Sequence, residues 1–166
     1  MHSSFIHRAQ EMIDKGYERI LILEDDVRLA PSFRRSLREV MAEADRIRPD
    51  WELIYIGRKR MSKNERQVAG SSMLAHPDYT YWTLGYALRR SGAIKLINQR
   101  PLQKIVAVDE YLPIMFDRHP NKEWLKNFEP RDLVALSAEP LLLEPTHYTG
   151  EPNYVSDTED SKVFGI

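Results

Sequence analysis

Apolar residues recur at helical spacing at the start of the chain and then form a short continuous run. Apolar positions recur at helical spacing over residues 5–13, and Gly16 can end that helix. The run Arg19–Leu23 is apolar and β-branched, which is typical of a strand covered on both faces. The chain passes directly from this run into three carboxylates at residues 24–26.

The remainder of the chain continues with helix-like and strand-like stretches. Pro31-Ser32 begins a second helix, whose apolar stripe ends at Pro49. Residues 57–70 are polar and basic and are predicted as an exposed loop. The other predicted elements are strands at 51–56, within 79–88, at 106–108, 134–136 and 141–143, and helices at 91–98 and 110–116.

Strands that alternate with helices predict the α/β class, with helices packed on a layered sheet. In such sheets ligands gather at the carboxyl ends of strands, where residues 24–26 fall. The 166 residues fit one domain, and 42% of them are hydrophobic. A net charge of −1 gives no sign of the basic surface that a nucleic-acid-binding protein needs. The lack of cysteine excludes disulfides and thiol catalysis. No apolar run reaches the length that spans a membrane.

Three consecutive carboxylates, Glu24-Asp25-Asp26, repel one another unless a positive group lies between them. A hard divalent cation with oxygen ligands, Mn²⁺ or Mg²⁺, meets this need and also binds phosphates. The alternative is a turn that Asp25 or Asp26 caps, with Glu24 solvated. His147 follows an apolar run and can supply a nitrogen ligand, although a lone histidine is more often structural; the other histidines, His119 among them, are predicted as surface or packing residues.

A second acidic pair, Asp109-Glu110, follows the predicted strand at 106–108. A carboxylate there can act as a general base if the fold brings it opposite the first acidic cluster. The alternative is a pair of helix N-terminal acids favoured by the helix dipole. Tyr81-Trp82 can stack on a sugar ring or belong to the core. The run 58–60 is basic and can bind phosphate or lie in a solvated loop.

Taken together, several strings resemble glycosyltransferase family 25, which contains the collagen β-galactosyltransferases and lipooligosaccharide glycosyltransferases. The resemblance covers nearly the whole chain. The strings are Leu23-Glu24-Asp25-Asp26, Trp51 to Arg60, Tyr81 to Ala87, Val108 to Asp117, Glu139 to Leu142, Pro145 to Gly150 and Ser156 to Glu159.

The resemblance implies a GT-A-like (Rossmann-like) fold and inverting, metal-dependent transfer of galactose from UDP-galactose to hydroxylysine of collagen or to a glycan acceptor. By the same resemblance, Glu24, Asp25, Asp26 and His147 are the metal ligands. Asp109 and Glu110 are the catalytic residues, with Asp109 as the base. The substrate-binding residues are Arg58, Lys59, Tyr81, Trp82 and Gly85.

The family pattern also implies residues before the acidic motif that this chain does not show. The first βαβ unit of the family is nearly absent, so we expect the C-terminal part of a catalytic domain over 1–150 and an acidic tail over 151–166. Exposed strand edges would favour a homo-oligomer. The relatives work in the endoplasmic reticulum lumen, although no signal or retention motif is visible. The alternative function is that of a non-catalytic adhesion or binding homologue, or of an inactive fragment. A metal-dependent phosphohydrolase is a weaker alternative, because the sequence shows neither the nucleophile nor the second metal cluster that such an enzyme would need.

Overall fold

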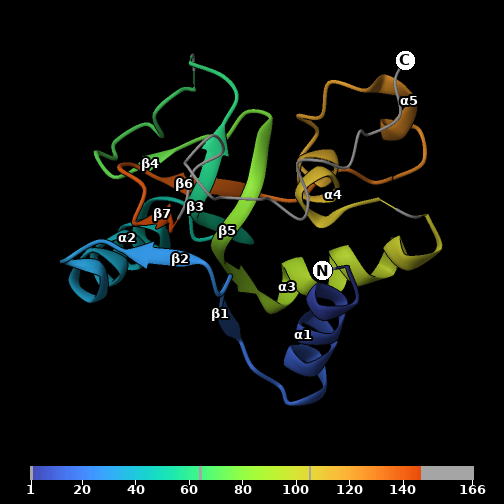
Figure 1. Cartoon of the computed structure of the whole chain (residues 1–166), viewed down its shortest axis with the longest axis horizontal. Helices are drawn as coiled ribbons and strands as arrows, with labels where there is room; N and C mark the ends of the chain where they lie inside the picture. Colours follow the sequence, from blue (N-terminus) through green and yellow to red (C-terminus); the bar gives the residue numbers. More distant parts are fainter. Residues whose placement is uncertain (1, 64, 105, 147–166) are drawn as a thin grey trace.

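The computed structural model describes residues 2–63, 65–104 and 106–146 and confirms the α/β class (Figure 1). Its helices are α1 (His2–Asp14), α2 (Phe33–Ile47), α3 (Arg90–Asn98), α4 (Val108–Met115) and α5 (Lys122–Leu125), with a 3-10 turn at Pro101–Gln103. Its strands are β1 (Arg19–Leu23), β2 (Val27–Leu29), β3 (Leu53–Arg60), β4 (Leu74–Ala75), β5 (Thr80–Arg89), β6 (Ala135–Ala138) and β7 (Leu143–Pro145). None of the described helices is long and apolar enough to cross a membrane.

Five strands form a mixed sheet in the order β1-β5-β3-β6-β4. Only β3 and β6 run parallel, and the other neighbours are antiparallel. Strands β2 and β7 form a separate antiparallel ribbon. A mixed sheet with flanking helices is consistent with the GT-A-like fold that the resemblance implied.

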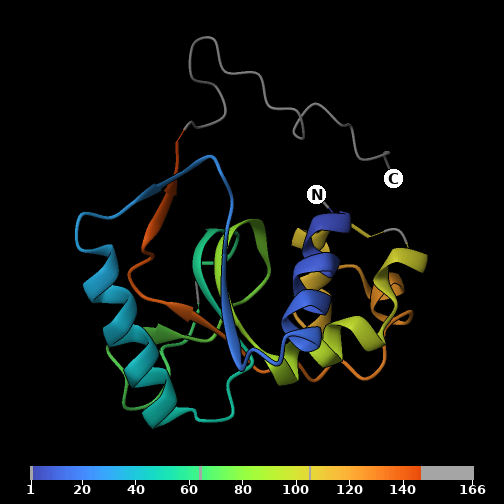
Figure 2. The same ribbon diagram turned by 90° about the horizontal axis from the view of Figure 1, so that it is seen from below.

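The sheet lies between two layers of helices because alternate side chains of its strands point to opposite faces. Leu53 and Tyr55 of β3 pack with α1, α3 and α4, whereas Ile54 and Ile56 pack with α2 and Leu143. Figure 2 shows α2 on one side of the sheet and the other long helices on the opposite side. The core is therefore two apolar clusters separated by the sheet.

Three predictions about these elements are wrong. Strand β1 is not covered on both faces: Leu21 and Leu23 are exposed, because β1 pairs only with β5 and lies at the sheet edge. The predicted loop at 57–70 begins too early, since β3 continues to Arg60. Residues 106–108 form no strand; Val108 is the first residue of α4, so the acidic pair lies in a helix.

Leu143 of β7 crosses the sheet directly above two paired glycines, Gly57 of β3 and Gly85 of β5. A Cβ at Gly57 would lie 2.5 Å from the Cβ of Leu143, and one at Gly85 would lie 2.5 Å from Leu143 Cδ1. Larger residues at these two positions are thus excluded by the ribbon. The lack of a side chain at both glycines lets the β2–β7 ribbon, and with it the acidic turn, lie close against the sheet.

Gly57→Ala is expected to destabilise the chain by about 1–3 kcal/mol, the usual cost of overpacking. The clashing atom is Leu143 Cβ, which moves only with the backbone of β7. Gly85→Ala is the matched variant: its two nearest atoms, Leu143 Cδ1 and Leu23 Cδ2, are side-chain ends, and the nearest backbone atom, the Ile22 carbonyl oxygen, is 3.2 Å away, so we expect a smaller loss. Urea unfolding of both variants measures the difference, and a Gly57→Ala variant as stable as Gly85→Ala would contradict it.

Candidate active site

The first acidic segment, Glu24-Asp25-Asp26, forms the turn between β1 and β2. The Glu24 backbone N–H donates to the carbonyl of Leu84 in β5 at 3.0 Å, and the N–H of Thr146 donates to the Asp26 carbonyl at 2.7 Å. The turn is therefore held between β5 and the residue that follows β7. Asp25 and Asp26 are exposed, whereas Glu24 is partly buried.

The three carboxylates of this turn repel one another. Burial, and then the charges of Asp26 and Asp25, raise the pKa of Glu24 above its usual value. No Lys, Arg or His side chain of the described residues pairs with any of the three. The turn therefore favours a bound cation on electrostatic grounds.

Ligand geometry limits what the turn can hold by itself. Within residues 2–63, 65–104 and 106–146, no group of three or more His, Asp or Glu side chains is placed to hold a metal ion. The donor chemistry fits a hard divalent cation that takes its other ligands from a diphosphate, and does not fit one caged by described side chains alone. The fourth predicted ligand, His147, lies outside the described residues.

Asp109 lies in the first turn of α4 and is half-buried. Burial, followed by the charge of Glu110, raises the pKa of Asp109, and the backbone N–H groups of residues 109 and 110 offset part of this effect. The charge of Asp109 in turn contributes to the raised pKa of Glu24. The two acidic segments, far apart in sequence, thus lie close enough for their charges to interact.

Tyr55 of β3 adds a buried polar atom beside Asp109. Its side chain is fully buried, its hydroxyl has no hydrogen-bond partner among the described residues, and its pKa is raised by burial and also by Asp109. Tyr86 packs against it, with ring centroids 6.5 Å apart, and its pKa is raised by burial, Tyr55 and Glu24. A buried tyrosine pair on the α1 side of the sheet is therefore near enough to both acidic segments for their charges to act on it.

Glu110 differs from its neighbour because its carboxylate is fixed by hydrogen bonds. Tyr79 Oη donates to Glu110 Oε2 at 2.9 Å, and His119 Nε2 lies 2.8 Å from the same oxygen. His119 is buried, as a packing residue would be, but its hydrogen bond to Glu110 was not foreseen. No sequence spacing links these three residues, so sequence patterns gave no signal for the network.

Lys59, Tyr81 and Trp82 lie together where β3 ends and β5 begins. The register between the two strands is irregular there. Lys59 pairs with Tyr81 and Arg58 with Thr83, which leaves Trp82 unpaired in a bulge. Trp82 has a φ of 48°, a left-handed conformation that is rare for a bulky residue and marks local strain. The Lys59 ammonium lies 4.1 Å from the centroid of the Trp82 ring.

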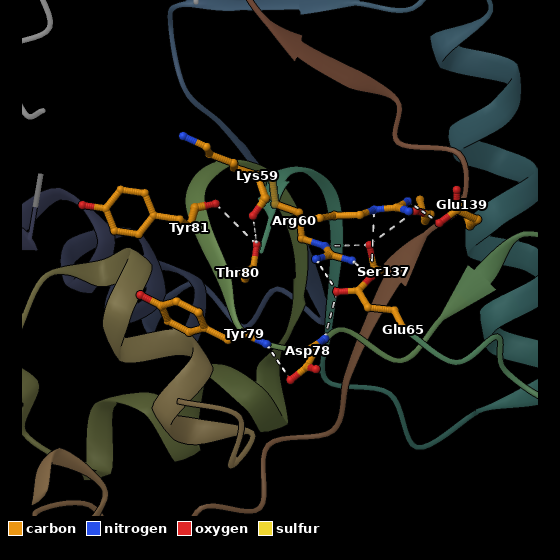
Figure 3. A network of polar contacts seen from close by, with 11 residues as sticks. Lys59, Arg60, Glu65, Asp78, Tyr79, Thr80, Tyr81, Ser137 and Glu139 are labelled. Carbon is orange, nitrogen blue, oxygen red and sulfur yellow. Dashed lines mark hydrogen bonds and ion pairs between the residues drawn. The ribbon is translucent and has the colours of Figure 1, made fainter. Parts of the chain in front are cut away.

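Arg58 does not bind a ligand as its basic run suggested. Its side chain is fully buried, and its guanidinium donates to both carboxylate oxygens of Glu65, at 2.8 and 2.5 Å, and to Ser137 Oγ at 2.9 Å. Figure 3 shows Glu65 and Ser137 in this network, with Tyr79 and Tyr81 on the opposite side of the strands. The expectation that Arg58 positions phosphate is therefore corrected: burial removes Arg58 from any ligand.

Gly85 also has a structural place. The space that a side chain would fill at Gly85 is occupied by Leu143 and by Leu23. Gly85 therefore serves the close packing of Leu143 and Leu23 on the sheet, and its assignment as a substrate-binding residue stays a prediction. Of the predicted site residues, the structure brings together Glu24 and Asp109, and separately Lys59, Tyr81 and Trp82.

Comparisons with known proteins place the chain among glycosyltransferases. The family model described as "Glycosyltransferase family 25 (LPS biosynthesis protein)" matches residues 6–112. The chain is 52% identical over 92% of its length to a "Glycosyltransferase 25 family member" of Aedes aegypti, covering 25% of that relative. It is 50% identical over 93% of its length to "Procollagen galactosyltransferase 2" of Mus musculus, covering 25% of that protein.

A further relative carries a different description. The chain is 48% identical over 93% of its length to the human "Inactive glycosyltransferase 25 family member 3", covering 26% of it. The chain spans about a quarter of the length of these curated relatives.

Proposed function

Because the chain belongs to glycosyltransferase family 25, we propose that it forms part of an enzyme that transfers galactose from UDP-galactose to hydroxylysine in collagen-like acceptors. The name of the mouse relative, procollagen galactosyltransferase, supports this donor and acceptor class. The observation that carries the proposal is a pair of acidic segments, one in a turn hydrogen-bonded to β5 and one with the half-buried Asp109 in α4, whose charge acts on Glu24. Two acidic segments with different burial suit one base and one cation site.

Asp109 is the proposed general base. Its raised pKa makes its carboxylate a better proton acceptor than an ordinary aspartate. It takes the proton of the acceptor hydroxyl while that oxygen forms a bond to the anomeric carbon, and the bond from this carbon to the diphosphate breaks with release of UDP. Attack from the face opposite the leaving group inverts the anomeric centre.

The proposed cation, Mn²⁺ or Mg²⁺, would be held by Glu24 and Asp26, with Asp25 beside them and His147 as a further ligand. Thr146, which bonds to the Asp26 carbonyl, immediately precedes His147 in the sequence, and this supports the choice. When bound, the cation neutralises the negative charge of the diphosphate. The protein side chains fix where that charge is neutralised, next to the base.

Lys59, Tyr81 and Trp82 are the proposed substrate contacts. An aromatic ring whose face already attracts an ammonium suits a sugar or a cationic peptide side chain. We further propose that residues 1–150 belong to the transferase domain, that residues 151–166 form a tail, and that copies of the chain can associate through the exposed edge of β1. We also propose the endoplasmic reticulum lumen as the location of the enzyme, and the name of the mouse procollagen galactosyltransferase supports a secretory-pathway enzyme.

A second candidate is a non-catalytic homologue that keeps the fold. The inactive human relative, at 48% identity, favours it. Against it stands the half-buried, ionisable Asp109, which is costly to keep unless it is used. Turnover separates the two candidates, because both would bind a donor.

Mn²⁺ is expected to raise the melting temperature of the chain. A ligand at about 100 times its Kd adds about 2.7 kcal/mol of stability. Asp26→Ala should abolish the shift, whereas Glu18→Ala, the same change at an exposed acid away from the turn, should preserve it. An unchanged melting temperature in millimolar Mn²⁺, or an equal shift in Asp26→Ala, would contradict the cation site.

A further inference from the structure

The carboxylate of Glu110 connects three segments of the chain. Glu110 lies in α4, Tyr79 immediately before β5, and His119 in the loop that follows α4. The hydroxyl of Tyr79 and the ring nitrogen of His119 both meet Glu110 Oε2, at 2.9 and 2.8 Å. The described residues direct no such bond to the other carboxylate oxygen.

The tautomer of His119 follows from its second nitrogen. The backbone N–H of Asn121 donates to His119 Nδ1 at 3.0 Å, so Nδ1 carries a lone pair. In the neutral ring the proton is then on Nε2, which donates to Glu110. The ring cannot turn freely, because it stacks on Trp124 at 5.0 Å and meets the edge of Tyr79 at 5.3 Å.

Asn121 links this ring to α5. Its side-chain oxygen accepts the N–H groups of Glu123 at 3.0 Å and Trp124 at 3.2 Å, which caps the helix. The chain of contacts therefore runs from α5 through the imidazole to the first turn of α4. A bond at this position fixes the rotation of that turn, and Asp109 is the preceding residue of the same turn.

We propose that Tyr79 and His119 are positioning residues that, by fixing the Glu110 carboxylate, hold Asp109 in its productive orientation. The inference rests on the proposed function and assigns Glu110 to support, and Asp109 alone to proton transfer. A carboxylate oxygen that is hydrogen-bonded to two side chains from other segments is held in place. A reacting group displaced by about 1 Å can lose about 10²-fold in rate, so such support bears directly on turnover.

The charge of Glu110 also acts on the base. It contributes, after burial, to the raised pKa of Asp109. The other titratable groups near Asp109 are Glu24 in the β1–β2 turn, Tyr55 in β3 and Tyr79 before β5. Glu110, unlike these three, lies on the same helix as Asp109. Once freed from its two hydrogen bonds, its carboxylate can turn into solvent and act less on Asp109, so the pKa of Asp109 should fall and the acid limb of kcat should move to lower pH.

The test uses Tyr79→Phe, His119→Phe and His119→Gln in a polypeptide that contains this segment and transfers galactose. Tyr17→Phe, which removes an exposed hydroxyl, is the matched control. Tyr79→Phe and His119→Phe are expected to lower kcat about 10–100-fold, with the donor KM within about twofold. His119→Gln keeps a donor near Nε2 and should retain more activity than His119→Phe, and Tyr17→Phe should match the unaltered protein.

A carboxyl titration of Asp109 by ¹³C NMR gives a readout that needs no turnover. We expect a lower pKa for Asp109 in Tyr79→Phe and in His119→Phe than in the unaltered protein. The positioning role would be overturned if both variants kept the Asp109 pKa of the unaltered protein and a kcat within twofold of it. It would also be overturned if His119→Gln and His119→Phe lost equal amounts of kcat while the acid limb of the kcat profile stayed in place. A folded, unaltered protein without transfer but with the expected NMR shifts would instead overturn the proposed function.

Discussion

Asp109→Asn is expected to lower sugar transfer by about 10²–10⁴-fold, the range that follows loss of a general base. The amide keeps the shape of the carboxylate but does not accept the proton of the acceptor hydroxyl. The loss corresponds to about 2.7–5.5 kcal/mol of transition-state stabilisation. It should fall on kcat, with the donor Kd nearly unchanged, because the proposed base acts on the acceptor hydroxyl and not on the donor. Steady-state kinetics and donor titration measure the two quantities.

The same substitution is expected to stabilise the folded chain at neutral pH. The folded state raises the pKa of Asp109, so it binds this proton more tightly than the unfolded state does. Ionisation of Asp109 therefore costs stability as pH rises from its unfolded pKa, ~4, through its folded value. Asparagine removes that cost, so the variant should have a higher melting temperature than the unaltered chain at pH 7. At a pH below both the unfolded and the folded pKa of Asp109, the two melting temperatures should be equal.

Glu18→Gln is the control for both effects, because it removes one charge from an exposed residue outside the site. It should change neither kcat nor the pH dependence of melting. A transfer rate in Asp109→Asn within about threefold of the unaltered protein would remove Asp109 as the base. A variant that is less stable at pH 7 would show that the carboxylate is needed for folding.

Arg58→Met is expected to cost about 3–5 kcal/mol of stability, the usual effect of breaking a buried ion pair. The substitution leaves the Glu65 carboxylate, which is 5% exposed, without its bidentate partner. Arg60, 3.9 Å away, and the N–H of Asp78, 2.9 Å away, remain near Glu65 and compensate only in part. Urea unfolding gives the loss as a lower midpoint at unchanged slope.

A second substitution separates charge from packing at the same site. Arg58→Met combined with Glu65→Gln removes the stranded charge and keeps an acceptor for the Asp78 N–H, so it should recover most of the loss. Arg35→Met, in an exposed pair with Glu39, should cost at most about 0.5 kcal/mol. A stable Arg58→Met variant with reduced donor binding would contradict the structural role and restore a ligand-binding one.

Hydrophobic periodicity predicted the helices at 5–13 and 31–49 and most of the sheet, because burial of one face is visible as a period. It did not predict where a strand lies in the sheet. The apolar run of β1 reads like a central strand, yet Leu21 and Leu23 are exposed at the edge. An apolar run reports the preference for a strand and carries no information about its neighbours.

Buried polar groups were the main source of error. Arg58 looked solvated because its partner, Glu65, is identified only by the fold. A second error has a different cause. The β-branched valines of Val106-Ala107-Val108 favoured a strand, while the acids that follow them favour a helix N-terminus. The helix formed, as the alternative for Asp109-Glu110 anticipated.

The candidate site was predicted in part. Both acidic segments were chosen from the sequence, and the structure brings Asp109 near Glu24 although one lies in a turn and the other in a helix. The network of Tyr79, Glu110 and His119 was missed, because hydrogen bonds between distant residues leave no period in a sequence.

The central claim is that this segment carries the base and the cation-binding acids of one galactose transfer. The most direct measurement is UDP release from UDP-galactose, with Mn²⁺ and a hydroxylysine peptide, by a polypeptide that contains this segment. We expect release that requires donor, acceptor and Mn²⁺ together, forms a β-linked product, and disappears when Asp26 and Asp109 are both replaced by asparagine. Transfer that continues at the same rate in this double variant, or that needs no divalent cation, would contradict the claim.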